Sequence, residues 1–339
     1  MDDGWSGCLA LKDRNQGSET ERQRNRPGYE QNNGLRMDGP ARQLTDCPYC
    51  HSAVSHFCVA TDRNRRITAE RFEYYRCEAC GLITLHPIPA DLGRYYPTDY
   101  YRVPKRVEEI RPLLRSERYK VDLVSRLAAG RRLLEIGPAI GCFALLAKEA
   151  GFLVDTIEMD RDCCRFLTEQ IQVRAVEHAD PLAVLPSLGA YDVIALWHVV
   201  EHVTQPWTIV RAAARQLAPG GILVIATPNP DALQLRVFGP HWTHLDAPRH
   251  VHLIPVQLLQ TWAGEERTDT ELATTVDPGS LNWNQFGWQR SLMASASNRL
   301  TRLARQCVGK LTGIAIAPIE RRRWRGACYT TVFRRREAA

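Results

Sequence analysis

A histidine, a glutamate and a second histidine follow one apolar run closely enough to act on a single reactant. Residues 191–197 are mostly apolar and predict a buried strand, and His198, Glu201 and His202 come directly after it. A neutral imidazole suits the removal of a proton from a hydroxyl or an activated carbon near neutral pH. We therefore interpret His198 as a general base that Glu201 and His202 orient. The structural alternative is that Glu201 bonds backbone amides of the turn while both histidines pack.

A second polar stretch, residues 242–252, combines aromatic, basic and acidic side chains after the last predicted parallel strand. Loops at the carboxyl end of such strands commonly face a ligand. We expect Arg249 to bind an anionic group of a small-molecule acceptor, and His250 or His252 is the other candidate base. The alternative is a polar loop that bonds its own backbone.

Four cysteines form two C-x-x-C pairs separated by twenty-six residues. Each pair turns tightly enough for two thiolates to face one ion, and four thiolates suit tetrahedral Zn²⁺. The predicted ligands are Cys47, Cys50, Cys77 and Cys80. A closed site of this kind is structural, so we expect zinc to fold the module and not to catalyse. His56 and Cys58 are less favoured ligands, and four reduced thiols are the alternative.

A glycine-marked turn joins an apolar strand, residues 133–136, to a predicted helix that begins near residue 142. Gly137 and Gly141 allow a positive φ and the close approach of a ligand to the backbone. The pattern is not the phosphate-binding G-x-G-x-x-G, and Glu135 at the strand end would repel a pyrophosphate. The turn therefore favours a cationic ligand without phosphate.

This turn resembles motif I of the class I S-adenosylmethionine (SAM) dependent methyltransferases, with Ala139 in place of the middle glycine. The agreement extends to an acidic residue after the second predicted strand, Glu158, to the H-x-x-E-H run and to an L-x-P-G-G turn at residues 217–221. The resemblance implies an α/β fold, namely a Rossmann-like, doubly wound, seven-stranded sheet. Its closing strand, around residues 327–333, would be antiparallel.

The same resemblance assigns the cofactor site. Glu158 takes the ribose position, where a carboxylate can accept hydrogen bonds from both hydroxyls, and Asp160 is the alternative. Asp180 falls where the family contacts adenine, although it could equally cap a helix. His198 would lie near the transferable methyl group. The full set of expected cofactor contacts is Glu135, Gly137, Ala139, Gly141, Glu158, Asp180 and Trp197.

Composition divides the chain into four parts. We expect a disordered extension at residues 1–46, which are polar, a zinc-ribbon module at 47–100, a connecting segment at 101–130 with its helix at 107–129, and the methyltransferase domain at 131–339. A zinc ribbon, a P-x-P turn and a tyrosine-rich segment before such a domain resemble bacterial two-part methyltransferases of polysaccharide and modified-sugar pathways. The expected reaction is therefore O- or C-methylation of a sugar or another biosynthetic intermediate.

The C-terminal end predicts an amphipathic helix at residues 298–311, with Leu300, Leu303 and Val308 on one face, and positive charge collects there. Residues 299–339 hold eleven Lys and Arg against two Asp and Glu, while the whole chain has a net charge of +6. This basic region could meet nucleic acid, an anionic membrane surface or a phosphorylated substrate, and a solvated face is the simpler interpretation. No run resembles a signal peptide or a transmembrane span, so we expect a cytoplasmic protein.

Three other functions fit parts of the sequence. H-x-x-E-H is also an inverted zinc-protease motif, with Glu265 or Glu271 as a third ligand, but Pro206 follows too soon for the required helix. RNA methylation is the second alternative, although the N-P-P-Y and P-C loops of RNA enzymes are missing. A non-catalytic, SAM-binding zinc-ribbon protein that reads nucleic acid is the third.

Overall fold

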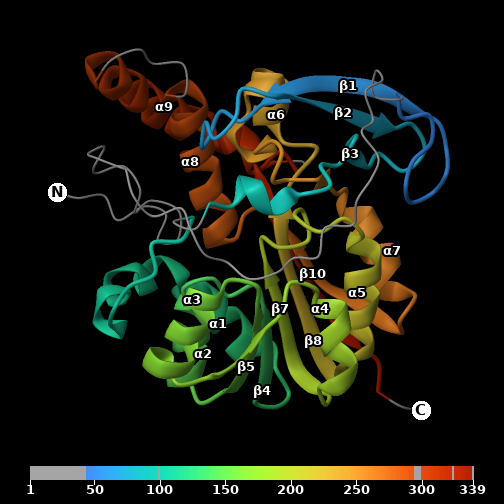
Figure 1. Ribbon diagram of the computed structural model, residues 1–339, viewed down its shortest axis with the longest axis vertical. Helices are drawn as coiled ribbons and strands as arrows, with labels where there is room; N and C mark the ends of the chain where they lie inside the picture. The colour runs from blue at the N-terminus through green and yellow to red at the C-terminus, as the bar shows by residue number, and fades with distance from the viewer. Residues whose placement is uncertain (1–42, 98–99, 294–298, 323, 338–339) are drawn as a thin grey trace.

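The computed structural model describes residues 43–97, 100–293, 299–322 and 324–337. Two sheets organise these residues: a seven-stranded sheet in the order β10-β11-β8-β7-β4-β5-β6 and a four-stranded sheet in the order β1-β2-β3-β9. Figure 1 shows the small sheet lying beyond one end of the large one. The predicted disorder of residues 1–46 falls almost entirely outside the described residues.

The large sheet confirms the predicted doubly wound fold. Its strands are β4 (Arg132–Ile136), β5 (Leu153–Glu158), β6 (Arg174–Glu177), β7 (Tyr191–Trp197), β8 (Leu217–Pro228), β10 (Thr268–Thr274) and β11 (Cys328–Arg335). Strands β6, β5, β4, β7 and β8 pair in parallel. Strand β11 is antiparallel to both β8 and β10, as the resemblance implied for the closing strand.

Alternate residues of each central strand enter different cores. Leu134 and Ile194 pack with one cluster, and Leu133 and Val193 pack with the other, because successive side chains of a strand point to opposite faces. One face is covered by α1 (Leu114–Leu127), α2 (Cys142–Glu149) and α3 (Arg161–Phe166), and the other by α4 (Pro181–Val184), α5 (Pro206–Arg215) and α7 (Val256–Gly264). The largely apolar sequences of these strands are thus the consequence of burial on both faces.

The small sheet joins distant parts of the chain. It contains β1 (Val54–Thr61), β2 (Arg71–Cys77), β3 (Ile83–Leu85) and β9 (His252–Leu253), and β9 pairs with β3. Its apolar side chains share a core with α6 (Leu233–Phe238) and the loop that follows α6. The cysteine-bearing segment therefore packs against the carboxyl end of the large sheet.

Two long helices, α8 (Pro278–Met293) and α9 (Arg299–Glu320), are inserted between β10 and β11 and pack against each other. The sequence predicted a helix at residues 298–311, and α9 continues to Glu320. The predicted connecting helix is shorter than expected, because two 3-10 turns, Val107–Glu109 and Arg111–Leu113, precede α1.

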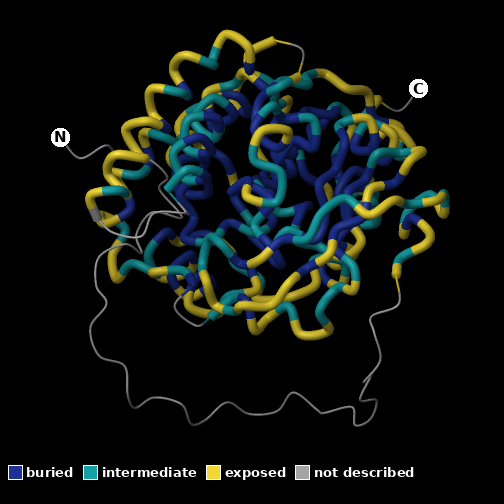
Figure 2. The backbone as a smooth tube through the Cα atoms, turned by 90° about the horizontal axis from the view of Figure 1, so that it is seen from above, coloured by how far each residue is buried: buried dark blue, intermediate teal, exposed yellow. Residues whose placement is uncertain are grey.

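The buried residues form the centre of the molecule, and the exposed ones lie at its rim (Figure 2). The remaining short helical turns are Leu92–Tyr95, Leu167–Ile171, Leu185–Ser187, Gly239–His241 and Thr243–Leu245. None of the helices in the described ranges combines the length and the apolar character that crossing a bilayer demands.

Candidate active site and metal centre

The four predicted metal ligands lie together. The sulfur atoms of Cys47, Cys50, Cys77 and Cys80 are all within 4.8 Å of one another. Two of the distances are 3.8 Å, between Cys47 and Cys80, and 3.4 Å, between Cys50 and Cys77. Thiolates about 2.3 Å from a tetrahedral zinc ion lie about 3.8 Å apart, so the cluster fits Zn²⁺.

Both C-x-x-C turns reverse through a left-handed residue. Gly81 follows the second pair with φ +75°, and His51 follows the first pair with φ +59°, where a side chain makes the conformation less favourable. Among the described residues, His56 and Cys58 are not part of the four-thiolate group. The structure therefore brings together the favoured ligand set.

The glycine turn after β4 is held in left-handed conformations. Gly137, Ala139 and Gly141 have φ values of +71°, +52° and +73°. A Cβ atom on Gly137 would lie 2.8 Å from a methyl of Val199, so this position has no room for a side chain. Ala139 adopts the left-handed conformation that the family pattern gives to glycine, at a cost of about 1–2 kcal/mol.

Glu158 locks this turn to the end of β5. One carboxylate oxygen accepts the backbone N–H of Ala139 at 2.9 Å, and the other accepts those of Met159 and Asp160 at 2.8 and 2.9 Å. The oxygen that accepts only the Ala139 N–H keeps a second lone pair, so the carboxylate can still accept a hydroxyl donor. Burial raises the pKa of Glu158 despite these three bonds.

Glu135 is a buried carboxylate with an unused oxygen. It is 3 % exposed, and its Oε2 atom has no hydrogen-bond partner within the described ranges. Burial raises its pKa to about 8, and the nearby Lys120 only partly opposes this shift. An unsatisfied acidic group beside the glycine turn fits SAM, which carries a sulfonium and an ammonium group, better than it fits a phosphate.

Trp197 is the last residue of β7, which pairs with β4. Its ring is 6 % exposed and meets Phe143 and Tyr119 edge-on, and the Lys120 ammonium lies 4.9 Å from its centre. Asp180, by contrast, is exposed and caps α4 by accepting the N–H of Leu182 at 2.9 Å. The structure thus shows the capping role that the sequence left open for Asp180, and the adenine contact stays a prediction.

His198 is held by Glu201. Its Nδ1 atom lies 3.2 Å from Glu201 Oε1, and Glu201 Oε2 accepts the hydroxyl of Thr227 at 3.0 Å. Glu201 has no exposed surface. Burial alone would raise the pKa of Glu201, but the hydrogen bond from His198 and the nearby histidine charges hold that pKa at about 2. An ionised Glu201 therefore requires Nδ1 of His198 to carry its proton.

The other imidazole nitrogen of His198 is left as an acceptor. Because Nδ1–H donates to Glu201, the neutral tautomer keeps its lone pair on Nε2. The side chain is 22 % exposed, and its ring lies 4.9 Å from that of Trp283 on α8. A partly exposed imidazole with a fixed tautomer can receive a proton from a bound acceptor.

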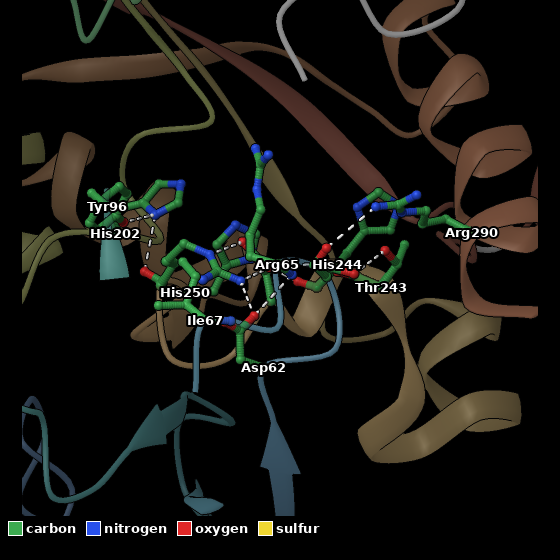
Figure 3. A network of polar contacts seen from close by, with 12 residues as sticks. Asp62, Arg65, Ile67, Tyr96, His202, Thr243, His244, His250 and Arg290 are labelled. Atoms are coloured by element: carbon green, nitrogen blue, oxygen red, sulfur yellow. Dashed lines mark hydrogen bonds and ion pairs between the residues drawn. The ribbon is translucent and has the colours of Figure 1, made fainter. Parts of the chain in front are cut away.

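His202 and His250 form a neighbouring cluster (Figure 3). Nδ1 of His202 lies 2.9 Å from the Tyr96 hydroxyl and 3.0 Å from the Arg249 carbonyl, and the two histidine rings are 4.6 Å apart. Burial, together with His250, lowers the pKa of His202 to about 4. Glu201, His202 and His250 also offer three ligand atoms within 4.8 Å, which is close enough for a metal ion.

Two expectations for the polar loop require correction. Arg249 has no exposed surface, and its Nη2 atom lies 2.6 Å from Asp62 and 2.7 Å from Asp246. This buried group ties the small sheet to the loop, and it does not face an anionic substrate. His252 is likewise buried in β9, next to the Thr204 carbonyl, and burial lowers its pKa to about 4. A base in contact with an acceptor must therefore be sought at His198 or His250.

Residues 109–267 match a protein-family model described as a methyltransferase domain. This part of the chain is a methyltransferase domain. The match contains the glycine turn, Glu158, the His198–Glu201 pair and His250.

Curated relatives match the same region. A ubiquinone biosynthesis O-methyltransferase of Xanthomonas oryzae pv. oryzae is 32% identical over 152 residues, which are 42% of this chain and 63% of that protein. The protein of the same name from Ralstonia nicotianae is 28% identical over 153 residues, 42% and 64% of the two chains. The chain thus spans just under two thirds of the length of these relatives. A solved SAM dependent methyltransferase from Archaeoglobus fulgidus covers 66% of this chain and 93% of its own, at 18% identity and a TM-score of 0.43.

The protease alternative is wrong for this methyltransferase domain. Residues 198–205 form a turn, and the next helix begins only at Pro206, so the H-x-x-E-H histidines do not share a helix. Its proposed third ligands are engaged elsewhere, since Glu265 pairs with Arg211 and Glu271 pairs with Arg334.

Two residues of the candidate site, Thr227 and Trp283, were not expected from sequence, whereas Tyr96 belongs to a segment whose role the sequence left open between packing and a substrate cleft. Thr227 follows the core of β8 at the same sheet edge as His198, so its place after an apolar strand was a usable signal. Tyr96 belongs to the tyrosine-rich segment, which packs onto His202. Trp283 had no local signal, because one aromatic residue in a helix is equally typical of core packing.

Proposed function

We propose that this chain is a SAM-dependent methyltransferase that methylates oxygen or carbon of a small biosynthetic intermediate, such as a sugar. The observation that carries the proposal is the His198–Glu201 pair at the carboxyl end of β7. Strand β7 pairs directly with β4, whose end bears the glycine turn. A base and a cofactor turn on adjacent strand ends are the two parts that such a transfer needs.

Residues at the carboxyl ends of β4 and β5, and the turn between β4 and α2, would hold the cofactor. Glu158 accepts a ribose hydroxyl, the turn at residues 137–141 allows close approach to the backbone, and Glu135 offers its unused oxygen to a cationic group. When bound, SAM supplies an electrophilic methyl group on a sulfonium whose departure as a neutral thioether needs no acid. The protein therefore contributes mainly position and the removal of a proton.

His198 removes the acceptor proton at Nε2. Glu201 stabilises the imidazolium that forms, because its buried carboxylate already bonds Nδ1–H. The proton then passes to solvent from the partly exposed ring. The relatives are named as O-methyltransferases, which favours a hydroxyl acceptor over carbon. Zn²⁺ on the four cysteines has a structural role in this proposal, since a four-thiolate site leaves no open position.

Calorimetry and product analysis test the proposal. The folded chain should bind SAM or its demethylated product with micromolar affinity or better, and Glu158→Ala should weaken that binding. Asp162→Ala, an exposed acidic position on α3, is the matched control. Incubation with SAM and candidate sugars, nucleotide-sugars, phenols and RNA should yield one methylated small molecule. The absence of a heat signal with either ligand contradicts the proposal. Methylated RNA as the only product would favour an RNA methyltransferase. Binding of SAM without turnover of any candidate would favour a non-catalytic SAM-binding protein.

A further inference from the structure

Helix α9 turns its large apolar side chains outward. Six of them are at least half exposed, namely Leu300, Leu303, Val308, Leu311, Ile314 and Ile319. We call these six residues the α9 stripe. A surface helix of a globular protein normally buries such residues and exposes its polar ones. Helix α9 instead exposes its large apolar residues together with its polar ones.

Glycines on the opposite face explain this orientation. Gly309 and Gly313 are buried against α8, where an added Cβ atom would lie 2.6 Å from the Gln289 backbone or 2.7 Å from the Gln285 side chain. These two glycines are four residues apart, so they share one face of the helix and let the two helices approach closely. The larger side chains are therefore left on the side away from α8.

The surroundings of the α9 stripe are basic. Residues 299–325 include eight Lys and Arg and one acidic residue. That residue, Glu320, is fully buried, with hydrogen bonds from Gln234 at 2.8 Å and Trp288 at 3.0 Å. Arg305, Arg321 and Arg322 are exposed. No acidic side chain of this segment therefore reaches the outer surface to offset the positive charge.

We propose that the α9 stripe docks onto the surface of an anionic lipid bilayer. Apolar residues flanked by Lys and Arg on one outward face are the features by which a helix lies in a membrane interface without crossing it. Trp324, which is 39 % exposed just beyond the helix, is a residue type suited to the same depth. A bound nucleic acid would contact the Lys and Arg side chains but would leave the α9 stripe exposed to water. A second copy of the chain would bring two positive surfaces together.

The docked helix lies close to the site. Helix α8 packs against α9 on one side and carries Trp283, whose ring touches His198, on the other. The docked helix would therefore lie one helix away from the proposed base, with the bilayer on its far side. This position favours an acceptor that is delivered from the membrane surface.

Vesicle co-sedimentation of the full chain tests the proposal. The chain should bind vesicles that mix phosphatidylcholine with an equal amount of phosphatidylglycerol, and it should bind phosphatidylcholine alone much more weakly. The triple variant Leu303→Gln, Leu311→Gln, Ile314→Gln should bind at least about tenfold more weakly. The matched control replaces three exposed apolar residues elsewhere, Leu153→Gln, Val237→Gln and Val276→Gln, and should bind like the wild type. Equal melting temperatures show that both variants are folded.

Three outcomes overturn the proposal. One is a folded wild type that binds neither vesicle. Another is a dimer that the α9 variant dissociates, without vesicle binding, which assigns the stripe to self-association. The third is salt-sensitive binding to RNA that the α9 variant retains, together with no lipid binding. A variant that replaces Arg305, Arg321 and Arg322 by Gln should lose the preference for the anionic vesicles.

Discussion

Nδ1 of His198 lies 3.2 Å from an oxygen of the fully buried Glu201, and the other oxygen of Glu201 is held by Thr227. The imidazole is thereby tied to both β7 and β8. Because Glu201 has no access to water, its negative charge depends on His198 as a hydrogen-bond donor. The burial of Glu201, three residues further along the chain, thus determines the tautomer of His198.

The variant Glu201→Gln should lower turnover by about tenfold to a hundredfold, because the amide no longer enforces the tautomer or stabilises the imidazolium. Steady-state kinetics measure this effect. Glu265→Gln, which changes an acidic residue at the surface, is the control. A lower melting temperature with unchanged kinetics would make Glu201 purely structural.

Replacement of Cys77 by Ser should remove bound zinc and destabilise the small sheet, because three thiolates no longer close the tetrahedral site. Cys58→Ser is the matched control and should retain about one equivalent of metal. Elemental analysis after purification under reducing conditions without chelators measures the zinc content. Loss of metal in Cys58→Ser with retention in Cys77→Ser would reverse the ligand assignment.

The stability of the fold should depend on pH through Glu135. Burial raises its pKa in the folded chain from 4.5 to about 8. Between these values the native state holds a proton that the unfolded chain has released, so the free energy of unfolding should fall as the pH rises. Glu135→Gln stays neutral and should lose less stability across the same window, by about 1.4 kcal/mol for each pKa unit of the shift.

Urea unfolding of wild type and Glu135→Gln at several pH values, without cofactor, measures this difference. Glu169→Gln, an exposed position near α3, should follow the wild type. If the free energies of unfolding of Glu135→Gln and the wild type change with pH in the same way, Glu135 is ionised in the folded chain throughout.

The large sheet could be predicted because its signals are local. Strands β4, β5 and β7 are rich in apolar residues, and a glycine follows β4, Glu158 ends β5 and His198 follows β7. Residues at adjacent strand ends must meet at one edge of the sheet. The same logic places His198 beside the glycine turn from the sequence alone. The four cysteines were equally accessible, since ligand spacing is a property of the sequence.

The remainder depends on packing between distant segments. Strand β9 has two residues and exists only because β3 lies beside it. Arginine is a residue type that commonly binds anions, and only the ion pairs of Arg249 with Asp62 and Asp246 show that it is a buried cross-link. The predicted apolar face of α9 is present, but the glycines that pack on α8 turn it outward. In each case a long-range contact decides between interpretations that the local sequence leaves equal.

The turnover of His198→Ala, measured with the acceptor identified by product analysis, tests the central claim most directly. Turnover should fall by about a hundredfold to ten-thousandfold, while SAM affinity and zinc content stay near wild-type values, because His198 acts on the acceptor proton alone. His250→Ala, at the other accessible candidate, should have a much smaller effect. Unchanged turnover in His198→Ala, with a large loss in His250→Ala, would contradict the account and move the base to the His202–His250 cluster.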